Sequence, residues 1–185
     1  MMMKRVLFFA VLVCFLFTGC LLPKSTKSNK TKPQASIDPE IKACFDLVNE
    51  FRTGKEAYYW NKNNITKTKL VGKLGKLTLD EELCRAAQIR ANELVKKFDH
   101  TRPNGSSCFT VLKECSISYS CCAENIAAGN KSGAQTFIQW KEDKEKYKGQ
   151  GHRRNMLGNY TKIGIAYVYD PNSKYKYYWE MILAK

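Results

Sequence analysis

The chain has 185 residues, of which 44% are hydrophobic and 26% charged, a composition that is ordinary for a globular protein and excludes global disorder. Lysine and arginine total 31 against 17 acidic residues, and the net charge of +14 favours polyanionic partners such as nucleic acid, anionic lipid or an anionic wall polymer. Beyond the N-terminus no apolar stretch approaches the roughly 20 residues of a bilayer-spanning helix, which excludes a polytopic membrane protein.

The first residues have the order of a secretory signal. Lys4 and Arg5 precede an unbroken run of 12 apolar residues, 6–17. Because this run is shorter than a spanning helix, it predicts a signal peptide over residues 1–19. The two leucines after position 20 would lengthen the run, so an uncleaved membrane anchor is the alternative.

The signal ends in Thr-Gly-Cys, which resembles a bacterial lipobox, where a small residue precedes a cysteine that is lipidated after cleavage. We therefore expect Cys20 to carry a lipid that holds the exported protein on a membrane of the cell envelope. Ordinary cleavage beside an incidental cysteine is the alternative, and it would give an extracellular protein. Residues 23–37 carry four lysines, no acid and almost no apolar side chain, so residues 20–37 are expected to form a lipidated, lysine-rich tether.

The folded domain is then predicted over residues 38–185. Six of the 31 basic residues and none of the 17 acids precede it, which leaves a net charge of +8. It has no Lys/Arg-rich helix, no aromatic RNA-binding motif and no zinc-finger spacing, so we expect no nucleic-acid partner. Nothing in the pattern specifies an oligomeric state.

The domain opens with a helix and a long loop. Asp38 is a suitable N-cap and Pro39 suits the first helical position. Apolar residues at three- and four-residue steps then predict an amphipathic helix that ends near Gly54. Residues 54–77 are rich in lysine and asparagine and predict a long loop, in which the aromatic run at 58–60 folds back as a local apolar patch.

A second helix is predicted from Thr78, which forms a capping box with Glu81, to about Phe98. Its buried stripe is expected to hold Leu83, Ala87, Ala91, Leu94 and Phe98.

A third helix is predicted to open at Ser132, with Ala134, Phe137 and Ile138 facing inward. Residues 163–169 and 175–183 are β-rich and flank an Asp-Pro-Asn-Ser turn, so they predict a hairpin. Helices before and among a few antiparallel strands indicate an α+β domain.

The chain has only two histidines, and both lie beside turn residues at the boundaries of elements. His100 follows the second helix, and His152 lies in a Gly-Gln-Gly-His-Arg-Arg-Asn segment. Glu124 lies between them in an otherwise small and apolar stretch, where a carboxylate is costly to bury without a partner. These three residues are candidates for one site. Surface histidines and a structural glutamate that pin loops together are the alternative.

Nearly all of residues 40–185 is similar in motif order and spacing to the CAP superfamily, which includes cysteine-rich secretory proteins, insect antigen 5, plant pathogenesis-related proteins and many bacterial members. The matching segments are residues 47–52, 79–83, 86–94, 100–105, 123–127, Trp140, residues 151–157, 163–165 and 178–179.

This resemblance implies an α-β-α sandwich with a central antiparallel sheet between helical layers. It also implies a cleft with two histidines and two acids that binds a divalent metal in some relatives. His100, Glu124 and His152 match three of these positions. The fourth, three residues after the tryptophan, falls on Asp143, with Glu142 beside it as the alternative.

Several functions fit such a cleft. Two imidazoles and the carboxylate of Glu124 can hold zinc with an open position for water, or a histidine can act with the carboxylate as an acid/base pair. The sequence offers no matched nucleophile, since nothing aims Ser106, Ser107 or Cys108 at an imidazole. We expect an exported, surface-tethered binding module for lipid or an anionic cell-surface ligand that requires no cofactor. A metal-dependent, protease-like hydrolase that uses the His/Glu cluster with a divalent metal such as zinc, and a structural envelope protein with a vestigial cleft, are the alternatives.

The chain has eight cysteines, of which Cys14 falls in the signal and Cys20 at the cleavage site. The other six predict up to three disulfides in an oxidising compartment, with 15 connectivities to choose from. The adjacent Cys121 and Cys122 are expected to form disulfides with different partners. Cys44 and Cys84 also fit buried free thiols on helix faces. The six candidates are Cys44, Cys84, Cys108, Cys115, Cys121 and Cys122.

Overall fold

The computed structural model describes residues 36–141 and 146–185. The predicted signal, Cys20 with its predicted lipid, and nearly all of the predicted tether lie outside the described residues, as do Glu142 and Asp143. Residues 36–185 form one compact unit. Within the described ranges, no helix is long and apolar enough to cross a membrane.

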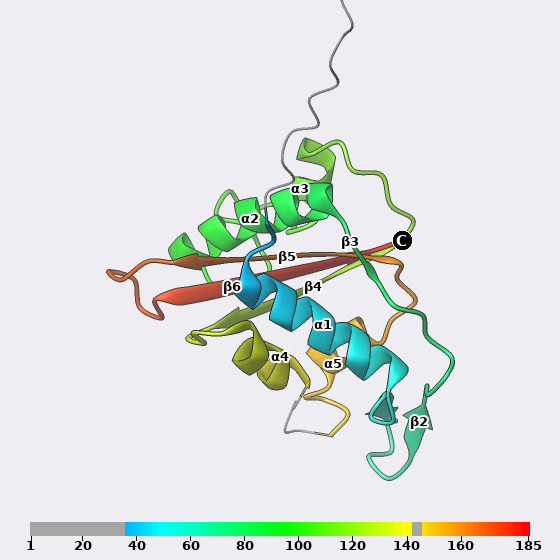
Figure 1. Cartoon of the computed structure of the whole chain (residues 1–185). Helices are drawn as coiled ribbons and strands as arrows, with labels where there is room; N and C mark the ends of the chain where they lie inside the picture. The colour runs from blue at the N-terminus through cyan, green and yellow to red at the C-terminus, as the bar shows by residue number, and fades with distance from the viewer. Residues whose placement is uncertain (1–35, 142–145) are drawn as a thin grey trace, which may run out of the picture. The chain divides into compact units, whose positions relative to one another are not determined.

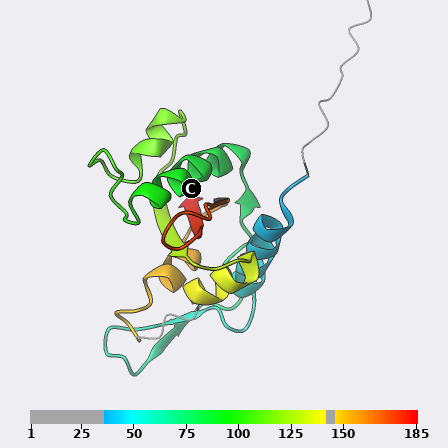
Figure 2. The same ribbon diagram turned by 90° about the vertical axis from the view of Figure 1, so that its left-hand side faces the viewer.

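The unit is a three-layer α-β-α sandwich, as the resemblance implied (Figures 1 and 2). Its sheet has the strand order β3 (Thr78–Leu79), β5 (Lys162–Tyr169), β6 (Tyr177–Ala184), β4 (Cys122–Ala128). Helices α2 (Glu81–Lys96) and α3 (Thr110–Glu114) cover one face, and α1 (Pro39–Thr53), α4 (Gly133–Lys141) and α5 (Gly151–Met156) cover the other.

The sheet is mixed, whereas a purely antiparallel sheet was expected. Strands β4, β6 and β5 are antiparallel, and the β5–β6 pair is the predicted hairpin. The short β3 runs parallel to β5. The long connection between them, which contains all the elements from α2 to α5, leaves the strand direction free, unlike a tight hairpin turn.

Side chains of β6 alternate between two cores, as the period of a strand requires. Trp179, Met181 and Leu183 pack into the larger core with α1 and α4. Ile182 packs under α2, and Glu180 shares this face. On the face of β5 that α2 covers, Gly164 leaves no room for a side chain. A Cβ on Gly164 would lie 2.2 Å from the backbone carbonyl carbon of Leu83 in α2. Helix α2 therefore lies directly on the sheet.

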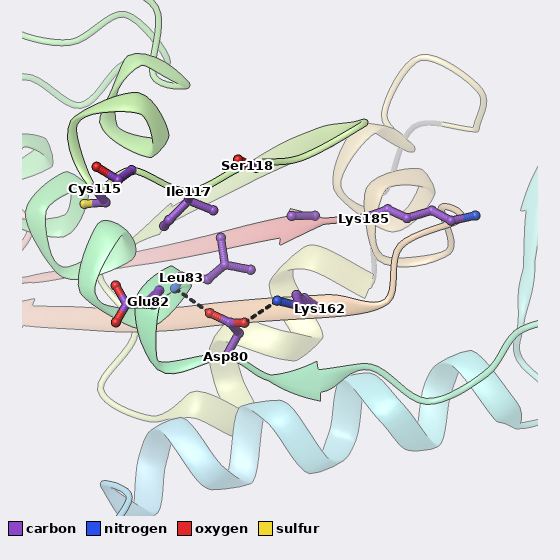
Figure 3. A pocket seen from close by; sticks show the side chains of 10 residues that line it. Asp80, Glu82, Leu83, Cys115, Ile117, Ser118, Lys162 and Lys185 are labelled. Atoms are coloured by element: carbon purple, nitrogen blue, oxygen red, sulfur yellow. Dashed lines mark hydrogen bonds and ion pairs between the residues drawn. The ribbon is translucent and has the colours of Figure 1, made fainter.

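The two long helices have N-caps of aspartate. Asp38 caps α1 as predicted, and its Oδ1 accepts hydrogen bonds from the backbone N–H groups of Glu40 and Ile41. For α2 the predicted threonine capping box is wrong, because Thr78 lies in β3. Asp80 is the cap: its Oδ1 accepts from Leu83 N at 3.0 Å, while its Oδ2 pairs with Lys162 Nζ at 2.8 Å (Figure 3).

Two predicted core positions are also wrong. Helix α2 ends at Lys96, so Phe98 lies beyond it and is 41% exposed. Helix α4 follows Ser132 and buries Phe137 as predicted, but Ile138 is 53% exposed and Trp140 is buried instead. The buried face of α4 therefore includes Phe137 and Trp140, and Ile138 lies outside it.

The predicted loop 54–77 contains a two-stranded antiparallel hairpin, formed by β1 (Tyr58–Trp60) and β2 (Lys67–Lys69). Contacts distant in sequence hold it: Arg153 Nε donates to Tyr58 O at 2.6 Å and Arg154 Nη1 to Trp60 O at 3.0 Å. The aromatic run does fold back in part, since Tyr59 packs against the larger core.

Candidate functional site

Glu124 is the centre of a buried cluster under α2. It lies on the edge strand β4, opposite Ile182 of β6, on the face that α2 covers. Both oxygens of its carboxylate are engaged: Oε1 accepts from Arg90 Nε at 2.9 Å, and Oε2 lies 2.6 Å from His100 Nδ1. Glu124 thus links the helix to the segment that follows it.

Arg90 positions the histidine. Its side chain is fully buried in the apolar stripe of α2, between the levels of Ala87 and Leu94. Besides Glu124, its guanidinium binds Glu93 Oε2 at 2.7 Å and donates from Nη2 to the backbone oxygen of Asp99 at 3.0 Å. The last bond fixes the chain one residue before His100, just after α2 has ended.

Arg102 secures the other side of His100. Its guanidinium donates to Glu93 at 2.7 Å and to Glu114 at 2.5 and 2.9 Å. These bonds tie the turn after His100 to both α2 and α3. His100 therefore lies on a short segment that two arginines hold in place.

Neighbouring charges and hydrogen bonds set the protonation states of Glu124 and His100. Burial alone would raise the pKa of Glu124, but hydrogen bonds from His100 and Arg90 outweigh it and hold that pKa below its usual value. The hydrogen bond to Glu124 raises the pKa of His100, against the opposing effect of partial burial. Glu124 is thus a carboxylate, and the imidazole is biased toward its charged form.

Glu180 lies deeper in the same cluster. It is fully buried on β6, diagonal to Glu124 across the strand pair, since Glu124 lies opposite Ile182. Among the described residues neither carboxylate oxygen of Glu180 accepts a hydrogen bond. Burial, followed by the charge of Glu124, raises its pKa well above the usual value. In its protonated form Glu180 can donate to Glu124, which gives the buried carboxyl a partner.

His152 approaches the free edge of β4 from the opposite layer. It lies on α5, and its backbone oxygen accepts from Asn125 Nδ2 at 3.1 Å. Asn155, one turn later, donates to the backbone oxygen of Glu124 at 3.1 Å and so covers the edge of the strand. A hollow of about 340 Å³ opens here, lined by His100, Glu124, Lys148, Gly149, Gly151, His152 and Asn155.

Three of the residues predicted from the sequence therefore line one hollow: His100, Glu124 and His152. Glu142 and Asp143 lie outside the described residues. Sequence reasoning missed Arg90 and Glu180. A signal existed for each, since a charged residue in the apolar stripe of a helix or within an apolar strand needs a buried partner.

The metal-ligating side chains within the described residues do not form a complete zinc site. A catalytic zinc usually has three protein ligands. Within residues 36–141 and 146–185 there is no group of three or more histidine, cysteine or acidic side chains with that arrangement. Glu124 faces Arg90 and His100 Nδ1, so it orients the imidazole, the place that carboxylates often take behind a histidine.

The nearest thiol is not an activated nucleophile. Cys108 is buried beside Glu124, and burial together with that negative charge raises the pKa of its thiol to about 12. The structure joins none of the six cysteines in the described ranges to one another. The disulfides stay a prediction.

Comparison with known proteins identifies the family. The family model described as "CAP: Cysteine-rich secretory protein family" matches residues 45–182, so the chain belongs to this family. The uncharacterised protein YkwD of Bacillus subtilis is 36% identical over 95 residues, which cover 50% of this chain and 35% of that protein. The match thus spans about a third of this relative.

Solved structures show the same α+β fold. An extracellular protein from Bacillus anthracis that contains an SCP domain superimposes with a TM-score of 0.57 at 21% identity, over 82% of this chain and 45% of that one. An outer surface protein of Borrelia burgdorferi gives a TM-score of 0.59 at 14% identity, over 81% of this chain and 95% of that one. At these identities the likeness extends to the fold alone.

Proposed function

We propose that this CAP domain is the binding module of an exported, surface-tethered protein, and that the hollow at His100 binds an anionic group of a lipid or envelope ligand. Export is supported by the apolar N-terminal run and Thr18-Gly19-Cys20. The names of two structural neighbours, an extracellular protein and an outer surface protein, are consistent with it.

One observation carries the choice of an anion: the carboxylate of Glu124 is held between Arg90 and His100. Arg90 offsets the charge of Glu124, and the pKa of His100 is raised, so the imidazole adds positive charge at the hollow. Lys148 lines the same hollow, whereas the side-chain amide of Asn155 already donates to Glu124 O and Asn125 Oδ1. This lining offers hydrogen-bond donors and positive charge, which suit a phosphate or carboxylate.

Calorimetric titration of residues 36–185 with glycerol phosphate tests the proposal. We expect saturable binding at pH 6 that weakens about tenfold in Lys148→Gln, because one charged donor is lost. Lys113→Gln removes an exposed lysine on α3 and serves as the control. Absence of binding by the wild type, or equal affinity in the Lys148 variant, would overturn the anion site.

A further inference from the structure

The β1–β2 hairpin and its flanks form a strongly basic segment. Residues 57–79 contain five lysines and no acidic residue. Three of these lysines, Lys62, Lys67 and Lys69, are exposed on the hairpin itself. This segment therefore concentrates positive charge in a domain that elsewhere mixes both signs.

The hairpin carries aromatic side chains among these lysines. Tyr58 lies opposite Lys69 and Trp60 opposite Lys67, so the four side chains share one face of the ribbon. Lys67 Nζ lies 4.1 Å from the ring centre of Tyr58 and 4.4 Å from that of Trp60. Both rings are only half-buried. Tyrosine and tryptophan favour membrane interfaces, where one side of the ring is apolar and the other is wet.

An apolar side chain stands at the tip. Ile65 is 80% exposed, more than any other large hydrophobic residue in the described ranges. The turn that presents it is ordered by Asn63, whose Oδ1 accepts from the backbone N–H groups of Ile65 and Thr66, both at 3.0 Å. Asn61 N also donates to Thr66 O at 2.9 Å. The exposed position of Ile65 is thus built into the turn.

Hydrogen bonds with the body of the domain hold the hairpin in place. Besides the bonds from Arg153 and Arg154, Trp60 N donates to Gln150 Oε1 at 3.2 Å. Figures 1 and 2 show β1 and β2 projecting from the body at the end where α1 finishes. A partner can therefore meet the tip without rearrangement of the core.

We propose that this hairpin docks on an anionic lipid bilayer, with Ile65 entering the interface and Lys62, Lys67 and Lys69 meeting the headgroup phosphates. Basic residues near an anionic membrane surface add to binding one by one, and an inserted apolar side chain adds hydrophobic burial. A soluble polyanion would use the lysines alone. The apolar tip and the half-exposed rings therefore favour a bilayer.

Vesicle co-sedimentation of residues 36–185 tests the proposal. This fragment is one compact unit with its own cores, so it can be studied without the apolar N-terminal run. We expect binding to phosphatidylglycerol vesicles and none to phosphatidylcholine vesicles. Substitution of the three hairpin lysines by glutamine should weaken binding roughly a hundredfold, and Ile65→Ser about tenfold. Ile65→Trp should bind at least as tightly as the wild type.

Matched controls make the same chemical changes elsewhere. Ile138→Ser on α4, and a triple glutamine variant of the exposed Lys113, Lys174 and Lys176, should bind like the wild type. Saturating free glycerol phosphate, which would occupy the hollow, should leave vesicle binding by the wild type intact, which separates the hairpin from the hollow. The proposal is overturned if the wild type does not bind anionic vesicles. It is also overturned if Ile65→Ser binds unchanged while soluble polyphosphate displaces the protein, since the hairpin would then be a polyanion site.

Discussion

The carboxyl group of Glu180 lies beside that of Glu124, in the buried layer between α2 and the sheet. The two groups differ in their environment. Glu124 has Arg90 and His100 as partners, whereas no described residue donates a hydrogen bond to Glu180. Two adjacent carboxylates repel each other, so the pair is stable when Glu180 keeps its proton and Glu124 does not.

Glu180→Gln should therefore stabilise the domain at neutral pH. The pKa of Glu180 is raised in the folded state, so above the unfolded value of 4.5 folding retains a proton that the unfolded chain has lost. Its contribution to the free energy of unfolding thus falls as pH rises. Glutamine keeps a donor toward Glu124 and does not titrate. Urea unfolding at pH 4 and pH 8 should show a gain at pH 8 and little change at pH 4.

Glu93→Gln is the matched control, because the pKa of Glu93 is lowered where that of Glu180 is raised, so the change in stability should have the opposite sign. Hydrogen bonds from Arg102 and Arg90 outweigh burial and lower the pKa of Glu93, so its loss should destabilise the domain above pH 5. If Glu180→Gln destabilises the domain equally at both pH values, the pKa of Glu180 is not raised in the folded state.

Arg90→Ala should be strongly destabilising, by about 3–5 kcal/mol, because it leaves the buried carboxylate of Glu124 without its buried cationic partner. Arg85 offers a control on the same helix: it is exposed and pairs with the exposed Glu82. Arg85→Ala should cost about 0–1 kcal/mol, the range of surface ion pairs. Chemical denaturation of both variants gives the comparison, and similar losses would mean that the Glu124 cluster adds nothing.

His100 should titrate above 6.5, its ordinary pKa, because its hydrogen bond to Glu124 favours the charged ring. The stabilisation from this pair is present below about pH 6.5 and is lost as pH rises through the raised pKa. In Glu124→Gln the His100 pKa should fall, since the carboxylate is gone and Arg90 remains. The ring resonances of the chain's two histidines can be followed by NMR. An unchanged His100 pKa in this variant would contradict the ion pair.

The cysteines should differ in reactivity. Burial raises the pKa of the Cys44 thiol to about 12, and burial with Glu124 does the same for Cys108, while Cys121 is exposed. In the reduced folded protein, Cys121 should be alkylated first at pH 8 and the two buried thiols only on unfolding. Alkylation of the exported protein without reductant tests the predicted disulfides. Six labelled thiols there would exclude them.

Much of the fold was predictable because its signals are local. The cap at Asp38, the apolar periodicity of α1 and α2 and the turn between β5 and β6 all lie within a few residues of the elements they specify. The β1–β2 hairpin was not predictable, since its strands are bonded by Arg153 and Arg154, far along the chain. The same holds for the short α5, which depends on contacts with the edge of β4.

The site was predictable only in part. His100, Glu124 and His152 were found from the scarcity of histidine and the resemblance to the CAP superfamily, and they share one hollow. Arg90 and Glu180 were missed because a charged residue in a helix or strand is usually exposed. Only the packing of α2 on β6 shows that both are buried next to Glu124.

The pKa of His100 with and without ligand tests the central claim most directly. An anion bound at the hollow stabilises the charged imidazole, so saturating glycerol phosphate should raise this pKa, as followed by NMR. Zinc, the alternative ligand, requires a neutral imidazole, so a metal site would lower it. A rise with glycerol phosphate and no response to zinc is the result that we predict. A fall with zinc, lost in His152→Ala, and no change with glycerol phosphate would contradict the anion site and favour the metal site.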